Sequence, residues 1–152
     1  MTKKQILVFA PYGSWTVHHQ VDAVIGAALQ IRGCDVKVIS CDGIFQNCFL
    51  SPSGNHCTSC QNAAIQLFSA FRLPITQLSS LVTEINRKEC HEWAFSLSAR
   101  KLSKAVFENK EIGKWVDGGM HTFFKTDHLD FENPDVILMN RSFLFNGALL
   151  KR

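Results

Sequence analysis

This sequence of 152 residues lacks both runs of charge and long apolar segments. Lysine and arginine form no run longer than two residues and the formal net charge is +3, so nothing argues for nucleic acid or a membrane surface as a partner. The amino-terminal apolar run ends at Pro11, too early for a signal-peptide core or a spanning helix. We therefore expect a cytoplasmic protein with no transmembrane segment and no nucleic-acid partner.

Common nucleotide-binding motifs are missing as well. The chain contains neither G-x-G-x-x-G nor the Walker pattern, and it has no internal repeat or low-complexity linker. Hydrophobic residues make up 46% and charged residues 19%, which is typical of a globular protein. Because this length is about that of one domain, we predict a single domain over residues 1–152.

Three apolar segments have the character of buried strands, at residues 5–10, 35–40 and 135–139. The first is a continuous apolar run before Pro11 and Gly13, as in a parallel strand covered on both faces. Apolar residues then recur at helical spacing until Gly33, which occupies a typical helix C′ position. Since right-handed crossovers make such strands parallel, we predict an α/β, Rossmann-like fold with a mainly parallel sheet flanked by helices. We also predict a Cys-rich loop insert after the second strand.

Further helices are predicted from the remaining patterns. One covers residues 61–71, and two lie between residues 79 and 104 with a break near Cys90 or Ser98. Another covers residues 112–124, although Gly118 and Gly119 weaken that pattern. Residues 145–152 have the pattern of a first helical turn, so we expect the chain to end inside a further α/β repeat.

The carboxyl ends of parallel strands meet at one edge of a sheet, where ligands of open α/β sheets bind. That edge is predicted to collect three loops, at residues 11–15, 41–60 and 140–146. In the first, Gly13 permits close approach of a ligand, and Ser14 or Thr16 caps the following helix. Helix amino ends receive phosphates or sugar hydroxyls, but an ordinary strand-to-helix turn has the same pattern.

His18 and His19 follow in the first turn of the predicted helix. Consecutive helical residues point about 100° apart, so at most one of them faces the crevice. A histidine there serves as a base or hydrogen-bond donor, or it is a surface or cap residue.

Four of the six cysteines form the second loop's main feature: Cys41, Cys48, Cys57 and Cys60, spaced C-x6-C-x8-C-x2-C. Cys57 and Cys60 form a chelating C-x2-C pair, and the other two complete a tetrahedral thiolate set for zinc or an iron-sulfur cluster. His56 is a possible substitute ligand. The spacing of these four cysteines matches no standard zinc finger. Their clustering within twenty residues is therefore stronger evidence for a metal site than their spacing.

Two alternatives to a metal stay open for these cysteines. The C-x2-C pair is also compatible with a redox dithiol, and all four thiols are compatible with an unligated state. Disulfides are the less expected outcome in a reducing compartment. Cys34 and Cys90 lie outside the cluster and are interpreted as small buried hydrophobic residues.

The stretch KKQILVFAPYGSWTVHHQVDAVIGAALQIRGCDVKVISCDG, followed by Cys48 and CTSC, resembles the amino-terminal half of bacterial GT-B-like glycosyltransferases of capsular polysaccharide biosynthesis. The later IGKWVDGGMHTFFK and PDVILMN are similar to a mid-domain helix and third strand of that group. The resemblance spans nearly the whole chain, but only the CDG-and-cysteine stretch is distinctive.

This resemblance implies an acceptor-side domain that needs a second, donor-binding domain for a sugar nucleotide. It implies substrate contacts from Gly13, Ser14 and Trp15, and a catalytic base at His18. Asn140 matches an asparagine after the third strand, but Asn-Arg-Ser replaces the usual Asn-Gly-Arg there. The first hypothesis is therefore a glycosyltransferase-like domain that is inactive alone, with a sugar acceptor as partner and a metal-stabilised cysteine loop. The second is a non-catalytic metal-binding, iron-sulfur or thiol-redox sensing module.

Overall fold

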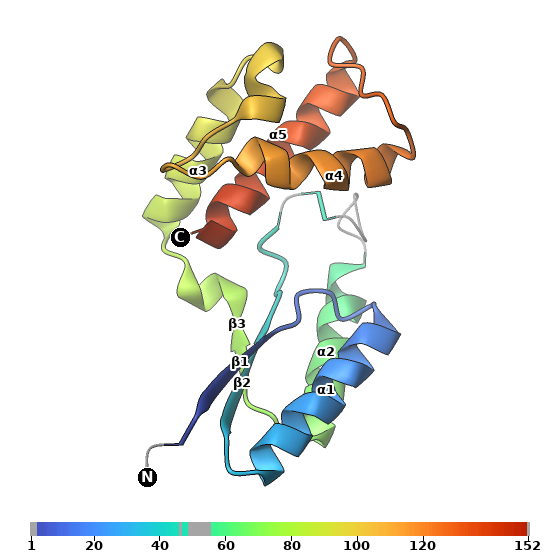
Figure 1. The fold of residues 1–152 in the computed structure, drawn as a ribbon, viewed down its shortest axis with the longest axis vertical. Helices are drawn as coiled ribbons and strands as arrows, with labels where there is room; N and C mark the ends of the chain where they lie inside the picture. Colours follow the sequence, from blue (N-terminus) through green and yellow to red (C-terminus); the bar gives the residue numbers. More distant parts are fainter. Residues whose placement is uncertain (1–2, 46, 49–55, 152) are drawn as a thin grey trace. The chain divides into compact units, whose positions relative to one another are not determined.

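The computed structural model in Figure 1 describes residues 3–45, 47–48 and 56–151. Contacts divide the chain into two compact units, Met1–Leu81 and Val82–Arg152. The first unit contains a three-stranded parallel sheet with helices, and the regular structure in the described part of the second is mainly helical. The prediction of one domain concerns independent folding, which this division does not test, and it stays a prediction.

The first unit alternates strands and helices. Its elements are β1 (Gln5–Phe9), α1 (Thr16–Ile31), β2 (Asp35–Ser40), α2 (Cys57–Ala70), β3 (Ile75–Gln77) and the 3-10 helix η1 (Leu78–Leu81). The strands are parallel in the order β1-β2-β3, with Ile6 opposite Val36 and Val38 opposite Ile75. The predicted α/β class and parallel sheet are therefore confirmed, while the Rossmann-like assignment stays a prediction.

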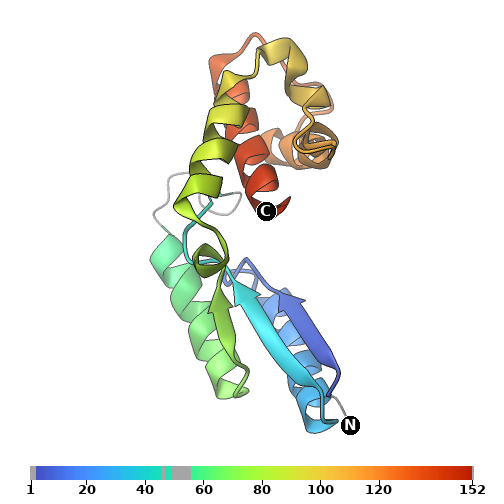
Figure 2. The ribbon, with the colours of Figure 1, turned by 90° about the vertical axis from the view of Figure 1, so that its left-hand side faces the viewer.

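Both helices of this unit cover the same face of the sheet (Figure 2). Strand and helix residues form the core between them: Ala10, Ala23, Val36, Val38, Ala64, Phe68 and Leu73. On the opposite face Leu7 and Phe9 remain 63% and 47% exposed. The prediction that the first strand is covered on both faces is wrong, because the strand order does not reverse and right-handed crossovers then lie on one side.

Helix α1 ends as its sequence predicts but buries an unexpected face. Gly33 has φ +86° and donates its N–H to the Gln30 carbonyl, as a glycine at C′ does. The buried residues of the helix are His19, Ala23 and Gly26. The apolar residues whose spacing predicted the helix, Val17 among them, mostly lie on the exposed side.

The second unit consists of four helical segments in its described part. They are α3 (Glu84–Ser96), the 3-10 helix η2 (Ala99–Lys104), α4 (Ile112–Phe124) and α5 (Pro134–Lys151). Helix α5 packs against both α3 and α4, and Phe145 and Leu144 on it are fully buried. The predicted helix at residues 112–124 and the predicted break near Ser98 are confirmed.

The strand predicted at residues 135–139 is wrong, because this segment lies in α5. The helix start is local: Pro134 takes the first helical position, and Asn133 Oδ1 accepts a hydrogen bond from the Asp135 N–H at 2.9 Å. A short apolar run fits a buried helix as well as a strand, so the pattern alone did not distinguish them. The third strand is instead β3, whose three residues are too few to show a pattern.

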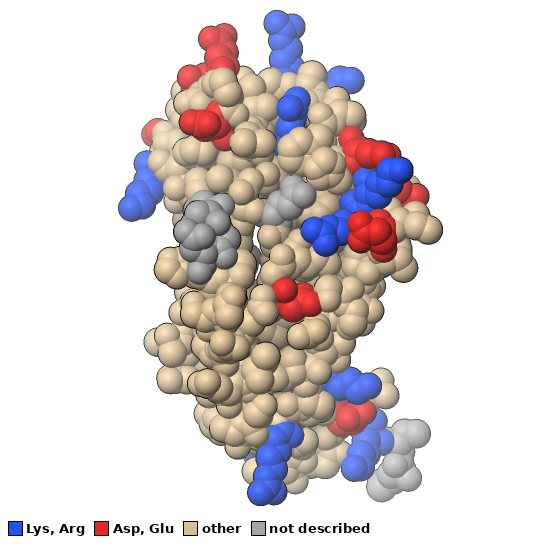
Figure 3. Space-filling model, turned by 180° about the vertical axis from the view of Figure 1, so that it is seen from behind, with Lys and Arg blue, Asp and Glu red and all other residues tan. Residues whose placement is uncertain are grey.

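Charges of both signs are scattered over the face shown in Figure 3, without a continuous basic patch. Among the described helices, none combines the length and the apolar character that crossing a membrane requires.

Candidate functional site

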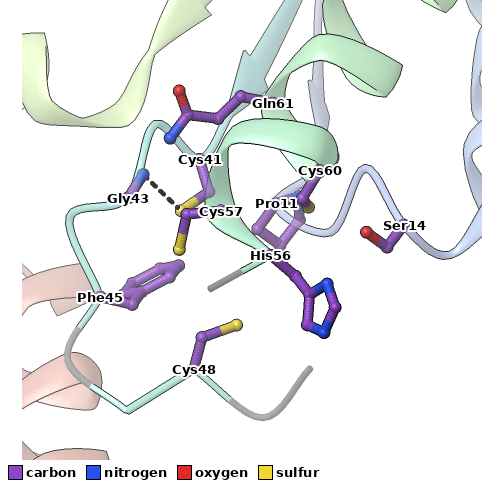
Figure 4. Close-up of a pocket in the computed structure, with 10 residues that line it drawn as sticks. All are labelled: Pro11, Ser14, Cys41, Gly43, Phe45, Cys48, His56, Cys57, Cys60 and Gln61. Atoms are coloured by element: carbon purple, nitrogen blue, oxygen red, sulfur yellow. Dashed lines mark hydrogen bonds between the residues drawn. The ribbon is translucent and has the colours of Figure 1, made fainter. Parts of the chain in front are cut away.

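A small pocket lies where β1 and β2 end, within the first unit (Figure 4). Three segments line it: Pro11 and Ser14 after β1; Cys41, Gly43, Phe45 and Cys48 after β2; and His56, Cys57, Cys60 and Gln61 at the start of α2. Its volume of about 20 Å³ is room for a water molecule or an ion. Two of the three predicted edge loops therefore meet here.

The described part of the second loop explains the C-D-G sequence. Cys41 directly follows β2, and Gly43 has φ +91°, a conformation that glycine adopts without strain. This turn brings the Gly43 N–H to Cys41 Sγ, with the two atoms 3.3 Å apart. Residues 46 and 49–55 of the predicted insert lie outside the described residues.

The Asp42 side chain attaches the loop that follows β2 to the helix η1. Its carboxylate accepts hydrogen bonds from the Ser79 N–H, at 3.1 Å, and from the Ser79 hydroxyl. Ser79 belongs to η1, immediately after β3. The three residues of C-D-G therefore have separate roles. Cys41 supplies a thiol to the pocket, Asp42 anchors the loop to Ser79, and Gly43 forms the turn.

Helix α2 supplies the C-x2-C pair from its first turn. His56 occupies the N-cap position, and Cys57 and Cys60 lie three residues apart, so they share one side of the helix. Figure 4 shows the sulfur atoms of Cys41, Cys48 and Cys57 directed toward a common space, with the Phe45 ring beside them. The amino end of a helix favours negative charge, which suits a thiolate or an anionic centre.

Burial, with a further contribution from neighbouring thiols, opposes the ionisation of Cys41 and Cys57. Burial raises the pKa of Cys57, and Cys48 and Cys60 raise it further. Burial also raises the pKa of Cys41, with a small contribution from Cys48, although backbone N–H groups, Gly43 first, partly oppose this. The pKa of Tyr12 is raised by burial and then by Cys48 and Cys41. Thiolates at this site therefore need a compensating positive charge.

The described residues contain no group of three or more His, Cys, Asp or Glu side chains already placed to hold a metal ion. The four predicted cysteine ligands thus share one pocket without forming a closed coordination set. His56, the predicted substitute ligand, lines the same pocket.

Gly13 has a packing role that the sequence did not indicate. A Cβ atom at this position would lie 2.0 Å from the Cys60 carbonyl oxygen and 3.0 Å from Ala64 Cβ. The missing side chain therefore lets the first loop approach α2. Ser14 lines the pocket, whereas Trp15 does not; the predicted ligand contacts of all three residues stay predictions.

The two adjacent histidines have different environments. His18 is exposed and its ring lies 5.0 Å from that of Trp15, but it does not line the pocket. His19 is buried with its ring 5.1 Å from Phe68, and neither ring nitrogen makes a hydrogen bond of good geometry. Burial lowers the pKa of His19 and outweighs the opposing effects of Asp22 and the Ala10 backbone, so the neutral ring is favoured.

Asn140 does not follow a strand, because it lies within α5 of the second unit. Its side chain is buried and Oδ1 has no hydrogen-bond partner. The prediction that residues 140–146 form a loop at the sheet edge is wrong, and the match of Asn140 to a residue after a third strand loses its structural basis.

Sequence reasoning missed Phe45 and Gln61 as lining residues. Gln61 had one signal, its position beside Cys60 at the start of a helix, whereas Phe45 had none. In comparisons with protein families, curated proteins and solved structures, nothing matches this chain.

Proposed function

We propose that the first unit is a metal-binding module whose thiolates hold a soft metal centre, either zinc or an iron-sulfur cluster. One observation carries this proposal: Cys41 and Cys48 from the loop after β2 and Cys57 and Cys60 from the start of α2 line a single pocket. Thiolate is the ligand form that both zinc and iron-sulfur clusters take.

The electrostatics of the pocket support a cation. Burial, followed by the neighbouring thiols, raises the pKa of Cys57, so without a nearby positive charge this side chain favours the neutral thiol. A bound cation reverses this balance and deprotonates coordinating thiols outright. The Gly43 N–H donates a hydrogen bond to Cys41 Sγ. Hydrogen bonds of this kind orient and stabilise a coordinating sulfur. The described residues contain no group of three ligands already placed to hold a metal ion. On this proposal, metal binding therefore moves the cysteine sulfurs closer together.

Elemental analysis and visible absorption of protein purified anaerobically, without affinity-tag metals, test this function. We expect about one zinc per chain in colourless protein, or iron with inorganic sulfide in brown protein. Cys41→Ser should remove most of the bound metal and lower the free energy of unfolding, because structural metal binding contributes directly to folding.

Cys34→Ser is the matched control, because Cys34 is half-buried like Cys41 but does not line the pocket. It should leave the metal content unchanged. Metal-free protein that folds fully, and that Cys41→Ser and Cys60→Ser do not destabilise, would contradict the proposal.

As a second candidate, we propose that the unit is the acceptor-side domain of a glycosyltransferase-like protein. The favouring observation is a row of rings at the start of α1: Tyr12 and Trp15 lie 5.5 Å apart, Trp15 and His18 5.0 Å apart. Trp15 is 43% exposed, and Ser14 beside it lines the pocket. The exposed rings of Trp15 and His18 in this row offer an amphipathic surface to a sugar acceptor.

In a chain joined to a donor-binding domain, His18→Ala should lower the rate of sugar transfer about 100-fold or more, the usual loss for a general base. The measurement is transfer from a sugar nucleotide to the acceptor, with His128→Ala as a control for an exposed histidine of the second unit. Transfer at the unsubstituted rate would exclude His18 as the base.

A further inference from the structure

The outward face of α1 carries an apolar stripe, which we define as Val17, Val21, Val24, Ala28 and Ile31. Its members recur at intervals of four, three, four and three residues along the whole helix. The four large side chains keep between 51% and 87% of their surface exposed. The stripe is therefore outside the core of its own unit.

The position of this stripe is unusual for a helix that covers a sheet. Such a helix normally buries its apolar side and exposes a polar one. Here α1 buries His19, Ala23 and Gly26 instead, and Ile25 adds a further exposed aliphatic residue beside the stripe. The other described helices each carry at most two large exposed hydrophobic residues. A concentrated apolar surface of this kind marks an interaction site.

The spacing of the stripe indicates what covers it. Alternating intervals of four and three residues are the seam spacing by which one helix packs against another through interlocking side chains. The stripe contains no charged residue, so placing it against an identical stripe buries no like charges. An isologous contact needs only this one surface, used by both copies.

We propose that α1 pairs with α1 of a second copy of this chain. The helices run antiparallel about a two-fold axis near Val24, which lies midway between Val17 and Ile31. Val17 of each copy then lies near Ile31 of the other, and the helix dipoles oppose each other favourably. This proposal is independent of the function proposed for the cysteine pocket.

The area is sufficient for a weak dimer. Burying the exposed parts of the stripe and Ile25 on both copies removes on the order of 1,000 Å² from water, near the lower limit for specific interfaces. Interfaces of this size are generally transient, so we expect a dissociation constant in the micromolar range.

Sedimentation equilibrium of the full chain across micromolar concentrations tests the pairing. The unsubstituted protein should shift from the monomer mass to twice that mass as concentration rises. Val24→Lys places two like charges at the two-fold axis and should raise the dissociation constant at least 100-fold. Because Val24 is 55% exposed, the variant should retain its fold, which circular dichroism verifies.

Ile85→Lys makes the same kind of change at another exposed aliphatic residue, 72% exposed near the start of α3. It should leave the dissociation constant unchanged. A chain that stays monomeric at several hundred micromolar would overturn the proposal. So would a dimer that Val24→Lys leaves intact, or one that Ile85→Lys disrupts equally.

Discussion

Replacing Gly13 with alanine is expected to lower the free energy of unfolding by about 3 kcal/mol, the upper part of the usual range for overpacking. The added Cβ would lie 2.0 Å from the Cys60 carbonyl oxygen, a backbone atom that a side-chain rotation cannot move. Either the first loop or the first turn of α2 must shift. The measurement is urea denaturation monitored by circular dichroism. If the first unit binds metal as proposed, its metal content should fall as well, because Cys57 and Cys60 lie in that turn.

Gly33→Ala is the control for this substitution. A Cβ at Gly33 meets nothing within 4 Å, but the residue has φ +86°. Its replacement should therefore cost only the backbone penalty of a left-handed conformation, about 1 kcal/mol. If Gly13→Ala is no more destabilising than Gly33→Ala, the close approach of the loop to α2 is not what requires glycine at this position.

Gly113→Ala should destabilise the second unit by about 2–3 kcal/mol, again because backbone blocks the new side chain. A Cβ there would lie 2.6 Å from the Ala105 nitrogen and 2.7 Å from the Leu102 carbonyl oxygen. The Gly113 N–H also donates to the Ala105 carbonyl at 2.9 Å, so the shift would strain the hydrogen bond between α4 and the end of η2. Hydrogen exchange of the α4 amides measures the loss directly.

The matched control lies in the same helix. Gly118 is in the interior of α4, and a Cβ there meets nothing within 4 Å. Gly118→Ala should stabilise α4 by up to about 1 kcal/mol, since alanine is the better helix former. Equal effects of the two substitutions would show that helix propensity, and not close packing, dominates at Gly113.

Local patterns predicted most of the first unit. The apolar run of β1, the glycine stop after α1 and the strand β2 are all readable from neighbouring residues, and they led correctly to a parallel sheet. The convergence of the cysteine loop and the first loop followed from the same rule about strand ends. These features depend on short-range chemistry, which the order of residues contains directly.

Other features depend on contacts between distant segments. The buried face of α1 was not predictable from its pattern, because Val17 and Val21 satisfy helical spacing whether they face the core or the solvent. Residues 135–139 form a helix because Asn133 and Pro134 start one, and Val136 is the one residue of this segment that is buried in the core. The role of Gly13 depends on α2, nearly fifty residues later in the chain.

The hydrogen bonds between Asp42 and Ser79 bear on when the site can form during synthesis. The thiols of Cys41, Cys48, Cys57 and Cys60 leave the ribosome before Ser79 does, so a nascent chain holds the cysteines while its loop still lacks an anchor. Of the elements of the first unit, β3 and η1, which supply this contact, are the last to be synthesised. A ribosome-bound chain that stops short of Ser79 would carry every proposed ligand and yet lack the contact that fixes their loop.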